Sequence, residues 1–227
     1  MQVAEEKRAA GYAAVDRFVR ADMACIGLGT GSTAFYAIER VGTLVAQGWN
    51  LSAVTTSVQT AQLCRERNIP VVGLCEGAPV AVAIDGADEV APDFALTKGG
   101  GGALFREKAV ALAAEKFVVV VDESKLVPHL GKFPLPVEVV PFTARYVERE
   151  IQRMCPQLTM RVRDGKTFVT DNGNYILDCS FGRIDDPAGL DARLRAINGV
   201  VASGLFVGLT SHVLVGSATG VREIERA

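Results

Sequence analysis

The chain of 227 residues has only two histidines, one tryptophan and no excess of charge of either sign. Because His129 and His212 lie far apart in the sequence and no Cys-x-x-Cys pair occurs, we expect no metal site. Lys and Arg total 24 against 26 Asp and Glu, which gives a formal net charge of −2. This balance excludes the global positive field that is typical of nucleic-acid or lipid-surface binding, so any anion site must be local.

Long apolar runs are also missing, since no stretch approaches the ~20 residues of a transmembrane helix. The N-terminus is charged ahead of Ala9–Val19 and lacks the apolar core of a secretory signal. The cysteines are odd in number and widely spaced, which favours reduced thiols over disulfides. They are Cys25, Cys64, Cys75, Cys155 and Cys179. These features together predict a cytoplasmic protein.

Apolar strand patterns alternate with helical patterns in the first part of the chain, and a hydrophobic content of 49% is enough for a substantial core. Strands are expected at 23–29, 53–56, 71–74, 80–84 and 117–121. Helices are expected at 3–20, 32–45 and 57–67, and after the glycine run 99–102 through 106–115. Alternation of this kind predicts an α/β fold, a Rossmann-like, mostly parallel sheet with helices on both faces.

The proline-rich segment Phe133-Pro134-Leu135-Pro136 marks a change of pattern. Beyond it we expect helices at 142–154 and 187–197, strands at 161–162, 167–169 and 175–178, and a hairpin turn at 171–174. This is the pattern of a smaller α+β, ferredoxin-like domain. A strand at 212–215 should return to the first sheet, so the predicted domains are 1–132 with 208–227, and 133–207.

A glycine turn, Gly27-Leu28-Gly29-Thr30-Gly31-Ser32-Thr33, joins the first expected strand to a helix. Its N–H groups and hydroxyls should converge on a helix N-terminus, which favours an anion. The turn is not a dinucleotide fingerprint, because Ser32 replaces the third glycine, and it is not a P-loop, because no lysine follows. A tight turn capped by Ser32 explains the same residues about equally well.

An acidic segment, Asp85-Gly86-Ala87-Asp88-Glu89, follows a buried strand, where open α/β sheets bind their ligands. Neighbouring carboxylates raise one another's pKa, which suits groups that take and return protons. A solvated Asp-Gly turn is the alternative.

Four consecutive glycines, Gly99 to Gly102, follow Lys98 and precede a helix that contains Glu107. Such a run loses much conformational entropy on folding and usually marks a close approach of backbone to ligand. Considered alone, Glu107 would be interpreted as a surface helix residue, and Lys125 and Lys7 would be interpreted as solvated lysines.

Taken together, Gly29–Ala34, Asp85–Glu89 and the segment Lys98–Lys108 resemble ribose-5-phosphate isomerase of the A type. The resemblance continues through 131–138, 170–174 and 199–206, so it spans nearly the whole chain. Departures are mild: Phe105 stands where a small hydroxyl residue is expected, and Ala81 and Ala91 replace acids.

The resemblance implies a role for each matching position. Glu107 matches the general base, and Asp85, Asp88 and Lys98 match catalytic partners. The implied substrate contacts are Thr30, Gly31, Ser32, Thr33, Asp85, Gly86, Ala87, Asp88, Lys98, Gly99, Gly100, Gly101 and Lys125. Apart from the resemblance, Lys7 on the first expected helix is a weaker candidate for a cation that contacts the substrate. The resemblance further implies no cofactor, a homodimer or homotetramer, and conversion of ribose 5-phosphate to ribulose 5-phosphate through an enediolate, in the pentose phosphate pathway.

Two other classes of protein use similar loops. A sugar-phosphate-sensing binding domain of a transcriptional regulator should carry a DNA-binding helix-turn-helix, for which this chain has neither the length nor a basic recognition helix. A coenzyme A transferase would form a covalent acyl-glutamate, which trapping would reveal.

Overall fold

The computed structural model describes residues 2–74 and 76–226. Cys75, one of the five thiols expected to be reduced, lies outside the described residues, and the other four cysteines are free thiols. The chain forms two compact units: Met1–Ala87, Arg106–Leu126 and Leu209–Ala227 make the first, and Asp88–Phe105 with Val127–Gly208 make the second. None of the described helices is both long and apolar enough to cross a membrane.

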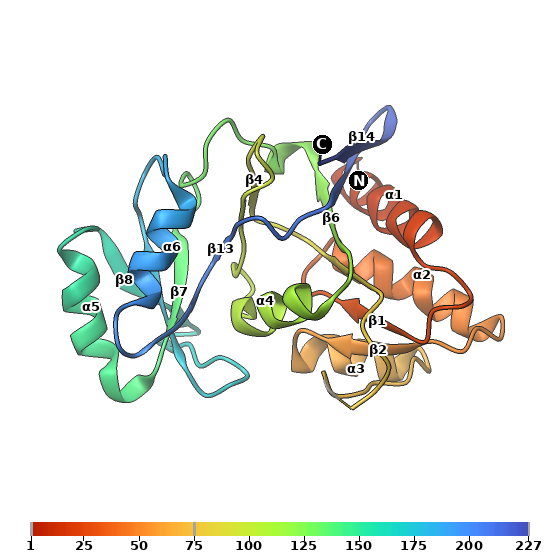
Figure 1. The fold of residues 1–227 in the computed structure, drawn as a ribbon, viewed down its shortest axis with the longest axis horizontal. Coiled ribbons are helices and arrows are strands. Elements are labelled where there is room, and N and C mark those ends of the chain that lie inside the picture. The colour runs from red at the N-terminus through yellow and green to blue at the C-terminus, as the bar shows by residue number, and fades with distance from the viewer. Residues whose placement is uncertain (1, 75, 227) are drawn as a thin grey trace. The chain divides into compact units, whose positions relative to one another are not determined.

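The first unit contains a six-stranded sheet in the order β15-β14-β6-β3-β1-β2. Figure 1 labels β14, β6, β1 and β2 of this sheet. Its strands are β1 (Cys25–Leu28), β2 (Ser52–Thr55), β3 (Val82–Asp85), β6 (Phe117–Asp122), β14 (His212–Ser217) and β15 (Gly220–Glu225). All neighbours from β2 to β14 pair in parallel, and only β15 is antiparallel. Strands β1, β3 and β6 are buried throughout, as continuous apolar runs in a covered parallel sheet should be.

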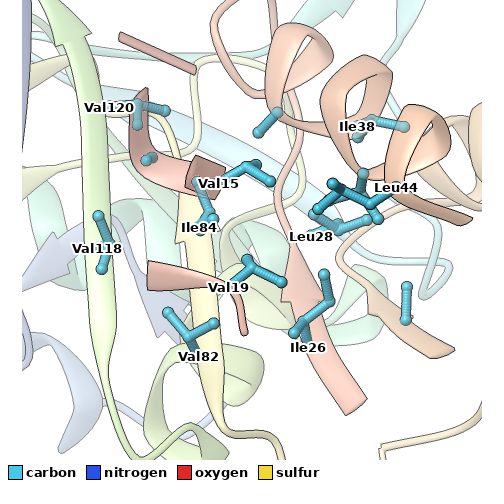
Figure 2. Packing of buried hydrophobic residues seen from close by; sticks show 14 of the residues in the cluster. Val15, Val19, Ile26, Leu28, Ile38, Leu44, Val82, Ile84, Val118 and Val120 are labelled. Atoms are coloured by element: carbon cyan, nitrogen blue, oxygen red, sulfur yellow. The ribbon is translucent and has the colours of Figure 1, made fainter. Parts of the chain in front are cut away.

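Helices cover both faces of this sheet. They are α1 (Gln2–Phe18), α2 (Ala34–Ala46), α3 (Val58–Glu66) and α4 (Leu104–Ala113). On one face, Val15 of α1 and Ile38 of α2 pack on Leu28, Ile84 and Val118 of the strands (Figure 2). On the other face, a Cβ placed on Gly27 would lie 2.5 Å from Val110 Cγ1 of α4, so this glycine lets the helix approach the sheet closely. The predicted Rossmann-like arrangement is confirmed.

The second unit contains an antiparallel sheet in the order β12-β7-β11-β8. Its elements are β7 (Leu135–Val139), α5 (Ala144–Gln152), β8 (Leu158–Met160), β11 (Tyr175–Cys179), α6 (Pro187–Arg195) and β12 (Val200–Ser203). The chain order βαββαβ is that of a ferredoxin-like fold, as expected. Apolar side chains of α5 and α6, among them Val147 and Leu194, pack with Val137 of the sheet.

Two smaller sheets complete this unit. One has the order β13-β5-β4, with β4 (Glu89–Val90), β5 (Leu96–Thr97) and β13 (Leu205–Phe206), and the other pairs β9 (Val162–Arg163) with β10 (Lys166–Thr167). Because β5 pairs with β13, residues 88–105 belong to the second unit, whereas the predicted division placed them and 127–132 in the first. Sequence patterns could not reveal a pairing between segments this far apart.

Several predicted elements differ from those observed. Residues 71–74 form no strand: Val71 makes a single bridge to Ala53, and the chain then turns at Gly73. The turn at 171–174 exists, but the strands beside it pair elsewhere, β10 with β9 and β11 with β7 and β8. The strands that were not predicted are β4, β5, β7, β8, β12, β13 and β15. Strand β7 begins in the proline-rich segment 133–136, from which only a change of pattern was predicted.

Candidate active site

The loops after β1 and β3 meet where the order of the parallel sheet reverses. From β1 the chain passes through α2 to β2 on one side, and from β3 it passes through α4 to β6 on the other. The crevice outside the carboxyl ends of two such strands is where open α/β sheets bind ligands. The glycine turn and the start of the acidic segment therefore share one location within the first unit.

Asp85 joins these two loops directly. Its side chain is 2% exposed, and its Oδ1 accepts hydrogen bonds from the N–H of Thr30 at 3.1 Å and of Gly86 at 2.7 Å. A Cβ on Gly29 would lie 1.9 Å from the same oxygen, so only glycine fits there. Hydrogen bonds from backbone N–H groups favour the ionised form of a carboxylate.

The hydroxyl of Thr30 belongs to a partly buried cluster of hydroxyls from the loop after β2 and the first turn of α3. Its Oγ1 lies 2.7 Å from Thr56 Oγ1, 2.8 Å from Ser57 Oγ and 3.1 Å from Thr60 Oγ1. Thr60 in turn donates to the carbonyl of Gly29 at 2.9 Å. This hydroxyl holds the turn in shape, a role that the sequence did not indicate because Thr56, Ser57 and Thr60 formed no recognised motif.

Ser32 and Thr33 stand at the start of α2. The N-cap is Thr33, whose side chain makes no capping hydrogen bond, so the alternative of a turn capped by Ser32 is wrong. Ser32 Oγ instead accepts from Lys7 Nζ at 2.9 Å, and the same ammonium lies 3.9 Å from Asp122 Oδ2. A cleft of about 490 Å³ opens beside the turn, lined in part by Gly31 and Ser32. Lys7 thus places a cation next to the glycine turn.

Lys125 ends η1 (Glu123–Lys125), the short 3-10 helix that follows β6 in the same unit. Asp122 caps this turn by accepting from the N–H of Ser124 at 3.0 Å. The predicted lysine therefore lies three residues past the carboxyl end of one parallel strand, β6, and Asp85 is the last residue of its neighbour β3.

Glu107 is 4% exposed and lies in the first turn of α4. The sequence placed Glu107 well inside the helix that follows the glycine run. In the structure the helix begins only at Leu104, so Glu107 lies close to its N-terminus. It shares the buried stripe of the helix with Leu104, Val110 and Ala111. Burial of a carboxylate costs free energy unless it is paired, and the N-terminal turn of a helix favours negative charge. The alternative of an ordinary surface residue is therefore wrong.

Asp88 and the glycine run meet within the second unit. Asp88 Oδ2 accepts from the N–H of Gly100 at 2.8 Å, and a Cβ on Gly100 would lie 2.6 Å from Asp88 Oδ1. Gly99 and Gly102 have φ of +98° and +92°, which side chains rarely tolerate. The run is therefore kept glycine both by its backbone conformation and by the carboxylate beside it.

Lys98 is 2% exposed, which is rare for a lysine. Its backbone N–H donates to the carbonyl of Gly204 at 2.8 Å, and its ammonium lies 5.5 Å from the centre of the Phe206 ring. Strand β5 thus fixes the backbone from which the side chain extends. A buried ammonium of this kind is a strong electrostatic feature of the second unit.

Glu89 has a structural position, although the sequence grouped it with the acids that carry chemistry. It is 2% exposed and accepts from Thr97 Oγ1 at 2.9 Å, from the N–H of Gly131 at 2.9 Å and from the N–H of Phe133 at 2.8 Å. Its oxygens are occupied in holding the segment 131–133. Glu89 is the first residue of β4, whereas the adjacent Asp88 precedes the strand and accepts from the glycine run instead.

The predicted site residues fall in both units. The first unit brings together Lys7, the turn Thr30–Thr33 and Asp85, and also carries Gly86, Ala87, Glu107 and Lys125. The second brings Asp88 to the run Gly99–Gly101 and carries Lys98. No group of three or more His, Cys, Asp or Glu suited to a metal ion occurs among the described residues.

These features define a class of protein: a Rossmann-like α/β protein with a ferredoxin-like second unit, a glycine turn at a helix N-terminus and buried carboxylates at its strand ends. A family model described as ribose 5-phosphate isomerase A (phosphoriboisomerase A) matches residues 52–220. The chain belongs to this family.

Relatives cover the rest of the chain as well. Ribose-5-phosphate isomerase A of Bacillus mycoides is 44% identical over 207 residues, 91% of this chain and 93% of its own. That of Methanothermobacter thermautotrophicus is 46% identical over 219 residues, 95% of this chain and 96% of its own. Ribose 5-phosphate isomerase A of Methanocaldococcus jannaschii has a similar structure, with a TM-score of 0.91 at 40% identity over 97% of this chain and 98% of its own.

Proposed function

We propose that this chain interconverts D-ribose 5-phosphate and D-ribulose 5-phosphate by proton transfer through an enediolate. The observation that carries the proposal is the burial of Glu107 on the inward stripe of α4, in a chain of the ribose 5-phosphate isomerase A family. A relative of known structure, 40% identical with a TM-score of 0.95 over all of both chains, is a D-ribose-5-phosphate isomerase in complex with phospho-erythronic acid. A four-carbon acid phosphate suits a site for a phosphorylated pentose.

The reaction begins with the ring form of the sugar. Asp85 assists opening by taking the proton of the anomeric hydroxyl and returning it to the ring oxygen. Glu107 then removes the proton from C2 of the open aldose, and the electron pair of that C–H bond forms the C1–C2 double bond of the enediolate. Return of the proton from Glu107 to C1 completes the ketose.

Negative charge develops on the sugar oxygens during this transfer. Lys98 and the N–H groups of Gly99, Gly100 and Gly101 stabilise that charge, and Asp88 exchanges protons with the C1 and C2 oxygens. Fixed donors of this kind need no reorganisation when the charge forms, which is the advantage of holding them on a constrained glycine run.

The phosphate anchors the substrate away from the reacting carbons. We assign it to the turn Thr30–Thr33, with Gly86 and Ala87 contacting the sugar and with Lys7 and Lys125 adding positive charge. The contact of Lys7 with Ser32 at 2.9 Å supports its place in this group. Anchoring at a remote group converts binding energy into correct orientation of C1 and C2.

The proposal includes no metal and no cofactor, a homodimer or homotetramer as the assembly, and the cytoplasm as the compartment. Purified, chelator-treated protein incubated with ribose 5-phosphate should form the ketose. Deuterium from the solvent at C1 or C2 of the recovered sugar would support the enediolate path. Binding of the sugar phosphate without turnover would favour the sensing domain and overturn the proposal.

A further inference from the structure

Arg161 forms a bidentate ion pair in the second unit. It follows β8 and its side chain is 10% exposed, while Asp178 lies on β11. Arg161 Nε donates to Asp178 Oδ2 at 2.9 Å, and Nη2 donates to Oδ1 of the same carboxylate. Two parallel bonds between a planar guanidinium and a carboxylate fix the direction of the remaining nitrogen.

That remaining nitrogen binds the glycine run. Arg161 Nη1 donates to the carbonyl of Gly99 at 2.8 Å and to the carbonyl of Gly100 at 3.2 Å. The carbonyl of Gly99 and the N–H of Gly100 belong to one peptide group, and this N–H donates to Asp88 Oδ2. One peptide group is thus held between a guanidinium at its oxygen and a carboxylate at its nitrogen.

The hydrogen bonds with Arg161 and Asp88 restrict the backbone of the glycine run, which has no side chains to do so. Four glycines have no side chains to pack and have access to many backbone conformations, so their orientation depends on bonds from outside. Phe168 lies beside both the glycine run and Arg161. A Cβ on Gly102 would lie 2.5 Å from its ring, and the Arg161 guanidinium is 5.9 Å from the ring centre.

We infer that Arg161, oriented by Asp178, is a positioning residue for the isomerisation. It fixes the Gly99–Gly100 peptide group and, through it, the carboxylate of Asp88 and the N–H donors of the run. The inference rests on the proposed function, in which Asp88 and these donors act on the sugar oxygens.

The test compares Arg161→Ala with Arg163→Ala. Arg163 is an exposed neighbour whose guanidinium lies 4.3 Å from the same Phe168 ring, so its loss removes a charge and a ring contact. We expect Arg161→Ala to lower kcat about 100-fold, the effect of a displaced catalytic geometry, with KM changed only a few-fold. Millimolar guanidinium, well below denaturing concentrations, should restore part of the lost kcat of Arg161→Ala. Arg163→Ala should keep the wild-type kcat, and added guanidinium should not change it.

Two further variants separate positioning from folding. Arg161→Lys keeps the charge but not the bidentate geometry, and should remain folded with low kcat. Asp178→Asn should lower kcat partway, because the guanidinium then loses its ionic partner. Wild-type kcat in Arg161→Ala, or a loss that follows the unfolded fraction and ignores guanidinium, would overturn the inference. Failure of the wild-type protein to convert ribose 5-phosphate would instead overturn the proposed function.

Discussion

The backbone N–H of Thr30 donates to Oδ1 of Asp85 at 3.1 Å, across 55 positions of sequence. This bond joins the glycine turn after β1 to the carboxylate at the end of β3. In the proposed function these two loops hold the phosphate and assist ring opening, so we expect a change in either loop to affect the other.

Glu107→Gln should abolish most turnover while the protein stays folded. The amide has nearly the same shape but cannot accept the C2 proton, so kcat should fall about 10²–10⁴-fold. Steady-state kinetics and thermal unfolding check this. Glu115→Gln is the matched control, an exposed glutamate just past the end of α4 that should keep wild-type kcat. Near-normal kcat in Glu107→Gln would remove this residue from the base role.

Gly29→Ala should damage both stability and activity. The added methyl group would lie 1.9 Å from Asp85 Oδ1, so the carboxylate must move and its bond to Thr30 must break. We expect a loss of about 1–3 kcal/mol in the free energy of unfolding, together with a lower kcat. Gly77→Ala is the control, because its methyl group would meet Val72 Cγ2 at an ordinary 3.4 Å. Equal unfolding curves for the two variants would contradict the crowding argument.

Glu89→Gln should reduce stability and leave the kcat of the folded protein nearly unchanged. One of its two acceptor oxygens becomes a donor facing N–H groups of the 131–133 segment, at a cost of about 1.5–3 kcal/mol. Denaturant unfolding measures the loss, and kinetics on the folded fraction measure kcat. A large fall in kcat with unchanged stability would return Glu89 to the catalytic group.

The thiol of Cys64 should make stability depend on alkaline pH. Burial raises the pKa of this thiol from 9.0 to about 11, although Arg67 and Arg65 oppose the shift. The folded protein therefore holds a proton that the unfolded chain releases. The resulting stabilisation is complete below pH 9 and lost as pH rises to about 11.

The measurement is the free energy of unfolding of wild type and of Cys64→Ala, from denaturant unfolding at each pH across this range. The difference between them should change by at most ~1.4 kcal/mol for each pH unit in this window. Burial also raises the pKa values of Cys155 and Cys179, but these thiols are common to both proteins and cancel. A difference that stays constant with pH would contradict the raised pKa of the Cys64 thiol.

Local patterns were sufficient for much of the fold. Apolar runs predicted β1, β3 and β6, and helical periodicity predicted α1 and α2 within a few residues. The expected strand at 71–74 was wrong because an apolar run alone does not ensure a partner strand, and the chain turns away at Gly73. Strand β15 was missed because its charged residues lie at an exposed edge of the sheet.

The candidate site, like the fold, could be predicted only in part from local patterns. Composition and spacing pointed to strand-end acids and an anion turn, and the family resemblance selected Glu107. Neither could separate Asp88, which meets the glycine run, from Glu89, which holds another segment, because both are acids in one short stretch. Nor could they reveal Arg161, whose contact with Gly99 spans 62 positions and follows no motif.

The sequence by itself therefore determined the alternation of elements, the fold class and the residue types at the strand ends, because periodicity and turn chemistry act over a few residues. Only the tertiary structure decided which of these residues meet. The order of the sheet made neighbours of β1 and β3 and so brought Thr30 to Asp85, and the packing of α4 buried Glu107. Such contacts depend on the pairing of distant segments, which local patterns do not specify.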